Sequence, residues 1–255
     1  MKKMLSDDIS LQVSKEIIDM FNTKNKLIIG CRGSGKTEIL KNAILLNFYT
    51  NKIKNIVVFS VNENMSYLIK RDISNMLGDF DNVEITKNSI KINETTVFFL
   101  SSIFWNRISN HGVDEVYCDE FSLFEPKIQE EILNYFNDKN IKITTGFYRT
   151  NKYGTNILSK LLCSERFKQT YLEWFNLKHL NDGLYWVKKE PNTGLTEKII
   201  MPENIDEKEV IKLNNKLLNL GWTPSSERIE KLEKNFNYES FCEEVLTIPS
   251  RNFIY

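Results

Sequence analysis

One short segment limits the possible folds of this chain more than any other feature. It follows the apolar run 27–29, fits the phosphate-binding loop pattern G-x-x-x-x-G-K-[ST], and reads Gly30-Cys31-Arg32-Gly33-Ser34-Gly35-Lys36-Thr37. A strand that leads through a glycine-rich turn into a helix surrounds a polyphosphate with backbone N–H groups, and the helix N-terminus adds partial positive charge. We expect the Lys36 amine to reach the β- and γ-phosphates and the Thr37 hydroxyl to bind Mg²⁺. The segment therefore predicts a site for ATP and Mg²⁺.

Around this loop, residues 1–150 alternate between extended and helical patterns. Apolar runs predict an edge pair or hairpin within 83–92 and buried strands at 26–30, 55–60, 95–100, 113–118 and 141–145. Apolar residues at helical spacing predict helices at 12–22, 38–48 and 63–77. This alternation produces a mainly parallel sheet with helices on both faces. We therefore predict an α/β fold of the P-loop NTPase class, in its ASCE or RecA-like form.

The pattern changes after residue 150. Residues 168–176 and 184–188 have extended patterns, and a Pro-Asn-Thr-Gly turn follows at 191–194. Residues 206–246 are mostly helical in pattern, with faces rich in Lys and Glu. We predict that 1–150 form the ATPase core, and that 151–255 complete it and add a small, mostly helical lid or subdomain.

Composition excludes several classes of protein. The 34 basic and 34 acidic residues give a formal net charge of +0, so the whole molecule has no strong field for nucleic acid, although a local basic patch is compatible with it. No apolar run is long enough to span a membrane, and the N-terminus lacks the apolar region of a signal peptide. The four cysteines show no paired spacing, which favours a reducing compartment over a zinc site or a disulfide framework.

A second motif places two carboxylates at the end of an apolar run, Val116-Tyr117-Cys118-Asp119-Glu120. Downstream of a phosphate-binding loop, the first acid is expected to hold Mg²⁺, directly or through water. The adjacent acid can orient and deprotonate an attacking water, which is general-base catalysis. We therefore predict that Asp119 is a metal ligand and that Glu120 is the catalytic base of a hydrolase.

Other polar residues have two open interpretations each. Gln12 either recognises the adenine edge or is a polar residue on an exposed helix face. Arg32 and Arg107 are predicted to stabilise the charge of phosphoryl transfer, Arg32 in its own site and Arg107 in that of a neighbouring subunit, or else they point to solvent. Arg149 is a competing candidate for the role of Arg107. The hydroxyl-rich strand end Thr144-Thr145-Gly146 either senses loss of the γ-phosphate and passes it on as a loop movement, or is a plain strand-to-loop turn.

Together these residues resemble the ATPase domain of large terminase subunits, the DNA-packaging motors of viruses. That family often has an arginine four positions before the lysine, as Arg32 stands here, and an upstream glutamine such as Gln12. Further resemblance lies in a hairpin before the acidic strand, the acidic strand itself, the coupling motif and a closing segment, which match 88–100, 113–121, 144–146 and 238–244. The resemblance covers most of the chain. Its specific part is the phosphate-binding loop and the acidic strand.

The resemblance implies an Mg²⁺-dependent ATPase that moves double-stranded DNA into a capsid by contacts to the DNA backbone. The implied partners are the portal protein and further copies of the chain. When assembled, these copies form a homopentameric ring in which an arginine such as Arg107 reaches the site of the next copy. The implied location is the host cell cytoplasm and, transiently, the capsid portal. Large terminases usually also carry a nuclease domain, and we expect none within these 255 residues.

Three other classes remain open at this stage. A superfamily 2-like helicase or remodelling ATPase would also use Asp119-Glu120 and Thr144-Thr145, but it needs a second RecA-like domain. A nucleotide-gated assembly switch would bind ATP without turnover, and Glu120 argues against it because a switch does not require a base. A generic AAA+ ATPase would need a sensor arginine after residue 200, where Arg228 is the candidate.

Overall fold

The computed structural model describes residues 11–78, 80–108, 112–146, 157–177, 180–189, 196–202 and 205–234. Its main element is an eight-stranded sheet of order β3-β4-β5-β2-β6-β7-β1-β8. The strands are β1 (Lys26–Gly30), β2 (Asn55–Ser60), β3 (Val83–Ile85), β4 (Ser89–Ile92), β5 (Thr95–Ser101), β6 (Glu115–Cys118), β7 (Asn140–Thr145) and β8 (Lys168–Leu172). The strands from β5 to β8 in this order run parallel, whereas β3 and β4 form an antiparallel hairpin at one edge.

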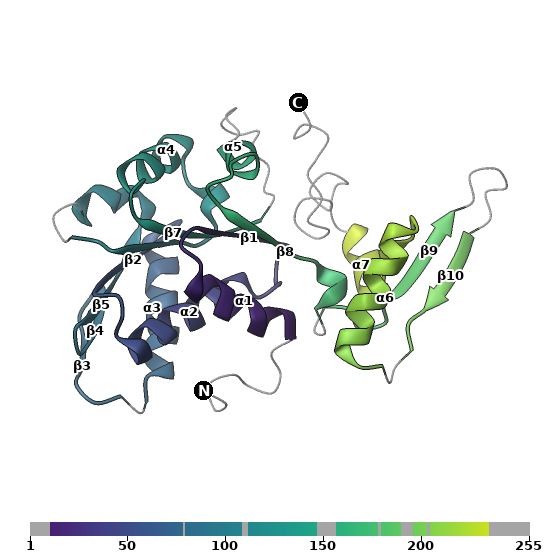
Figure 1. Cartoon of the computed structure of the whole chain (residues 1–255), viewed down its shortest axis with the longest axis horizontal. Coiled ribbons are helices and arrows are strands. Elements are labelled where there is room, and N and C mark those ends of the chain that lie inside the picture. The colour runs from purple at the N-terminus through teal and green to yellow at the C-terminus, as the bar shows by residue number, and fades with distance from the viewer. Residues whose placement is uncertain are drawn as a thin grey trace.

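Helices cover both faces of this sheet, as Figure 1 shows. On one face lie α1 (Leu11–Asn22), α2 (Lys36–Thr50) and α3 (Glu63–Met76), and on the other lie α4 (Pro126–Tyr135) and α5 (Ile157–Leu162). The predicted α/β fold, with a mainly parallel sheet between helices, is therefore confirmed. None of the helices that the structure describes combines the length and the apolar character needed to cross a bilayer.

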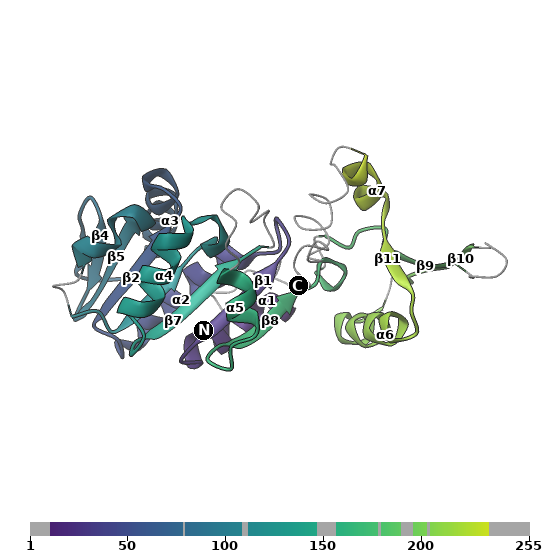
Figure 2. The ribbon, with the colours of Figure 1, turned by 90° about the horizontal axis from the view of Figure 1, so that it is seen from above.

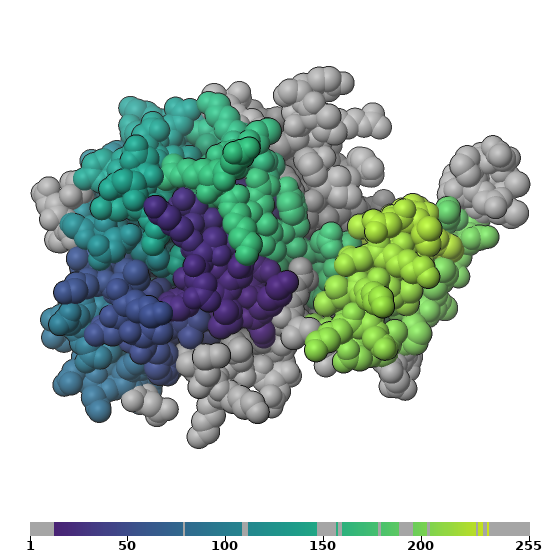
Figure 3. Space-filling view, viewed as in Figure 1, coloured from purple at the N-terminus to yellow at the C-terminus, as the bar shows by residue number. Residues whose placement is uncertain are grey.

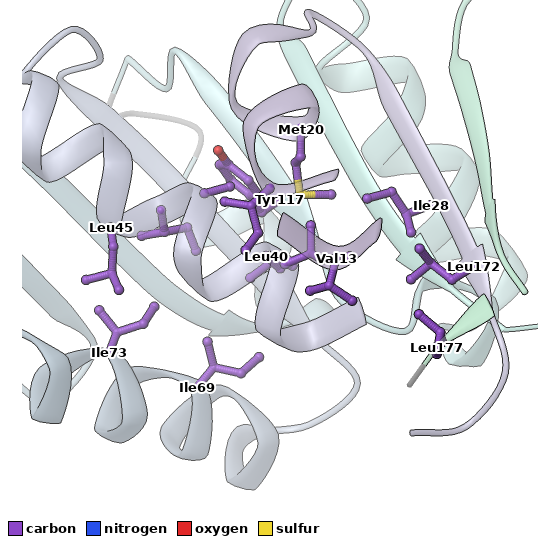
Figure 4. Packing of buried hydrophobic residues seen from close by; sticks show 14 of the residues in the cluster. Val13, Met20, Ile28, Leu40, Leu45, Ile69, Ile73, Tyr117, Leu172 and Leu177 are labelled. Carbon is purple, nitrogen blue, oxygen red and sulfur yellow. The ribbon is translucent and has the colours of Figure 1, made fainter. Parts of the chain in front are cut away.

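The two hydrophobic cores follow from the alternation of side chains along each strand. Ile28 and Tyr117 point to the same face of the sheet, where they pack with Leu40 of α2 and with Val13 and Met20 of α1 (Figure 4). Their neighbours Leu27, Ile29 and Cys118 belong to the opposite cluster, which includes Ile132 of α4. Because both faces are buried, these strands read as continuous apolar runs in the sequence.

A buried ion pair fixes β7 against β6 within the first of these cores. Lys142 Nζ lies 2.7 Å from Glu115 Oε1 and donates to the backbone carbonyl of Phe21 at the end of α1. Asn47 of α2 donates to Glu115 and to the Tyr117 hydroxyl. Burial lowers the pKa of Lys142, and Glu115 opposes that shift. A one-residue slip of β7 would leave both charges buried without partners, so the pair specifies the register.

The C-terminal unit contains a small sheet in addition to the predicted helices. It contains α6 (Glu207–Asn219) and α7 (Glu227–Glu233), and also a three-stranded antiparallel sheet of order β10-β9-β11, formed by β9 (Tyr185–Lys189), β10 (Thr196–Ile200) and β11 (Thr223–Ser225). Figures 2 and 3 show this unit beside the larger body, and in the ribbon of Figure 1 the chain passes to it after β8. The sequence predicted neither β10 nor β11. Pro224 argues against a strand, and β11 tolerates it because it lies at a sheet edge.

Candidate nucleotide-binding site

The phosphate-binding loop connects β1 to α2 with the geometry that its glycines require. Gly33 and Gly35 have φ angles of +78° and +87°, a backbone region that residues with a Cβ avoid. At Gly30, an added Cβ would lie 2.4 Å from the Ser34 hydroxyl oxygen and 3.0 Å from the Leu172 Cβ, so a larger residue would have to push these side chains aside. The loop therefore holds its backbone in a shape that residues other than glycine would strain, with Lys36 as the first residue of α2.

Lys36 is turned back over this loop. Its amine donates to the carbonyls of Gly30 at 3.1 Å and Cys31 at 3.0 Å, and it lies 3.3 Å from Glu120 Oε1. The residue is only 4% exposed, so its charge is compensated by these three oxygens rather than by water. The contact with Glu120 brings the two sequence motifs together, although the strands β2 to β5 lie between them in the sequence.

Asp119 lies where β6 ends, between the start of α2 and the end of β7. The Thr37 hydroxyl is 3.2 Å from both carboxylate oxygens, and the Thr144 hydroxyl donates to Oδ1 at 2.6 Å. Burial raises the pKa of Asp119 to about 6, and the charge of Glu120 adds to this shift, while the hydrogen bond from Thr144, the positive charge of Lys36 and the hydrogen bond from Thr37 oppose it. A carboxyl group with a strongly raised pKa beside a phosphate-binding loop is typical of a functional site.

The oxygen atoms of Thr37 and Asp119 fit Mg²⁺. Magnesium prefers oxygen ligands and usually binds through one or two carboxylates together with substrate phosphates. The Asp119 carboxylate is buried and shifted toward its neutral form, so a divalent cation would stabilise its ionised form. In the part of the chain that the structure describes, no cluster of three or more His, Cys, Asp or Glu offers an alternative metal site.

Glu120 has an unusual backbone conformation. Its φ and ψ angles are 54° and 48°, the left-handed region, which costs a residue with a Cβ about 1–2 kcal/mol. Its Oε1 faces Lys36, and its Oε2 is buried without a hydrogen-bond partner among the described residues. An unsatisfied carboxylate oxygen beside the phosphate-binding amine is able to accept a proton or orient a water.

The predicted coupling motif contacts Asp119 and the short turn that follows Glu120. Thr144 bonds to Asp119, whereas the next residue, Thr145, donates to the Ser122 hydroxyl oxygen at 2.7 Å and accepts from the Ser122 backbone N–H at 3.1 Å. The Ser122 hydroxyl in turn donates to the Gly146 carbonyl at 3.2 Å. Ser122 was missed by the sequence analysis, and its only signal was a hydroxyl two positions after Glu120.

Among the described residues, Arg32 and Arg107 make no hydrogen bond or ion pair with this cluster, and Arg149 lies outside them. Arg32 is exposed at the loop surface. Arg107 is exposed on the short helix η1 (Ser102–Ile108), with its guanidinium 3.8 Å from the centre of the Phe104 ring. This helix follows β5, four strands from β1, which corresponds to about 19 Å at the usual strand spacing. Gln12 lies in the first turn of α1, and its side chain lies outside the described residues.

No protein-family model matches the sequence, and no curated protein matches it either. Solved structures do match the fold. The large terminase of a thermophilic bacteriophage in complex with ATP-gamma-S aligns with a TM-score of 0.55 and 11% identity over 94% of this chain and 52% of its own. The ADP complex of a large terminase from the same phage has a TM-score of 0.51 at 11% identity, over 94% of this chain and 53% of its own. A mutant ATPase domain of the Thermus phage P74-26 large terminase has a TM-score of 0.53 at 10% identity, over 91% of this chain and 92% of its own.

The sheet, the glycine loop and the adjacent carboxylates define the fold of a P-loop NTPase. More particularly, the chain has the fold of the ATPase domain of phage large terminases. It spans about half the length of the large terminases that hold a nucleotide, and nearly all of the separate ATPase domain.

Proposed function

We propose that this protein hydrolyses ATP to drive double-stranded DNA into a viral capsid, as a terminase-type packaging motor. The observation that carries the proposal is the 3.3 Å contact between Lys36 and Glu120, which places a carboxylate base beside the amine of the phosphate-binding loop. A switch that only binds nucleotide does not need a base there. The ATPase domains with the same fold, two of them in large terminases with a bound nucleotide, support the assignment.

In this proposal each residue of the site has a separate task. The loop N–H groups and Lys36 bind the phosphates, and Thr37 and Asp119 hold Mg²⁺. When bound, Mg²⁺ neutralises negative charge on the phosphate oxygens. Glu120 orients the attacking water and accepts its proton through Oε2, the oxygen that Lys36 leaves free. Arg32, exposed in the loop, folds back toward the γ-phosphate and stabilises the charge of the transition state.

Movement would follow from the contacts at the end of β7. Thr145 and Gly146 bond to Ser122, two residues after the base, so a change at Glu120 on loss of the γ-phosphate is passed to the end of β7. Arg107 lies on η1 after β5, four strands from the strand that leads into the phosphate-binding loop, and in a ring it would serve the neighbouring copy. The proposed partners are the portal protein, the DNA backbone and further copies of this chain, as a pentamer.

The test is ATP hydrolysis by the wild type and by Glu120→Gln, with and without double-stranded DNA and across protein concentration. We expect Glu120→Gln to bind ATP and lose turnover, and the wild-type rate to rise with DNA or with concentration. Glu125→Gln is the matched control, because Glu125 is exposed and makes no side-chain cap to its helix. A normal rate in Glu120→Gln would refute the base, and ATP binding without turnover in any condition would favour a nucleotide switch.

A further inference from the structure

The left-handed conformation of Glu120 must be imposed by its surroundings, because the residue does not favour it by itself. Upstream, the Asp119 N–H donates to the Phe59 carbonyl of β2. Downstream, the turn η2 (Phe121–Leu123) closes through the Leu123 N–H, which donates to the Glu120 carbonyl at 2.9 Å. A single short turn has few hydrogen bonds of its own, so contacts from other elements decide whether it persists.

One side chain from α4 provides such a contact. The Gln129 amide donates to the Phe121 carbonyl at 2.7 Å and to the Phe124 carbonyl at 3.1 Å. These carbonyls lie one and four residues after Glu120, so the two bonds span the whole turn. Gln129 is 6% exposed, and water has little access to replace its amide. Removing the amide would leave two buried carbonyls with fewer partners, a change that the turn would relieve by moving.

We propose that Gln129 is a positioning residue that holds residues 120–124, here called the catalytic loop, and thereby Glu120, in the productive conformation. The inference rests on the proposed function, since it gives Glu120 the role of base. Among the described residues, the Gln129 side chain donates only to the backbone of the turn and not to the phosphate-binding loop. The same helix also holds η1, because Glu131 accepts a hydrogen bond from the Trp105 indole at 2.9 Å. α4 thus supports both the loop of Glu120 and the short helix that carries Arg107.

The variant that tests this is Gln129→Met, which keeps the length of the side chain and removes its donors. The matched control is Gln169→Met, because Gln169 donates in the same way to a carbonyl, that of Leu162 at 2.7 Å, far from the catalytic loop. We expect Gln129→Met to lower kcat about tenfold, equal to about 1.4 kcal/mol of activation free energy, with KM for ATP within about twofold of the wild type. The control should stay within about twofold in both constants. A wild-type kcat in Gln129→Met would overturn the proposal.

A double variant separates positioning from general stability. If Gln129 acts through Glu120, then Gln129→Met in the Glu120→Gln background should reduce the residual turnover no further. A further tenfold loss there would show that Gln129 acts elsewhere. Normal turnover by Glu120→Gln alone would instead refute the base, and hence the proposed function, whatever Gln129→Met does.

A second measurement needs no turnover. Amide hydrogen exchange in the full chain should become faster at residues 122–124 in Gln129→Met, because the turn opens more often, and should stay unchanged there in Gln169→Met. Unchanged exchange at 122–124 would mean that Gln129 does not hold the loop. This result can be read even if the ATPase requires partners that are missing from the assay.

Discussion

The substitution Asp119→Asn should stabilise the protein while it removes a proposed metal ligand. Asp119 is 1% exposed and its pKa is raised to about 6 from an ordinary value of 3.8, chiefly by burial. The folded protein therefore binds the carboxyl proton more tightly than the unfolded chain does. The ionised form that exists at neutral pH opposes folding, and asparagine has a similar shape without the charge.

The magnitude follows from the shift in pKa. A raised pKa lowers stability as pH rises from about 4 to about 6, because the unfolded state loses its proton first. With about 1.4 kcal/mol per pKa unit, the penalty is about 1 kcal/mol at pH 4.5 and about 3 kcal/mol above pH 7. The asparagine amide must also rearrange against Thr37, which we expect to cost about 1 kcal/mol. The net gain at pH 7.5 is then about 2 kcal/mol, or roughly 4–8 °C in Tm.

Unfolding of the wild type and of Asp119→Asn by urea, at pH 4.5 and at pH 7.5 without nucleotide, measures this difference. Asp138→Asn is the control, because Asp138 is a surface residue with 65% of its side chain exposed. The advantage of Asp119→Asn should shrink by about 2 kcal/mol at the lower pH. A variant that is less stable than the wild type at pH 7.5, or an advantage that does not depend on pH, would refute the account of Asp119 as a charge held at a cost in stability.

Two further predictions concern the phosphate-binding loop. Lys36→Ala should abolish nucleotide binding or turnover, because the amine is the buried cation of the loop; a fluorescent ATP analogue that binds with unchanged affinity, together with unchanged turnover, would contradict this. Arg32→Ala should lower kcat about 10³-fold and leave ATP affinity unchanged, as removal of an arginine that contacts only the transition state does. Steady-state kinetics at saturating ATP measures the effect, and an unchanged rate would mean that Arg32 stays in solvent.

The sequence predicted those parts of the site whose residues are adjacent in the chain. The loop from Gly30 to Thr37 and the pair Asp119-Glu120 carry their chemistry within a few positions, so their roles can be proposed without a fold. The parts that it missed are contacts across elements. Ser122 and Gln129 have no motif of their own, and their importance follows only from the carbonyls and hydroxyls that the fold places beside them.

The same division holds for the fold. Long apolar runs predicted the strands of the main sheet, whereas β10 and β11 were missed because a short edge strand needs little apolar surface and, in β11, even tolerates a proline. For Arg107, the sequence shows only that it lies shortly before the acidic strand; the fold adds that β2 lies between β5 and β6 in the sheet. Its predicted role toward a neighbouring copy stays a prediction.

The sequence by itself determined a glycine-rich turn between a strand and a helix, a carboxylate pair at a strand end, and a parallel sheet covered on both faces. Local sterics and the periodicity of apolar residues are sufficient for these features. Only the tertiary structure decided that β7 lies between β6 and β1. That order brings Thr144 to Asp119 and Thr145 to Ser122. Strand order depends on packing and on the buried Lys142–Glu115 pair, which join residues far apart in the chain.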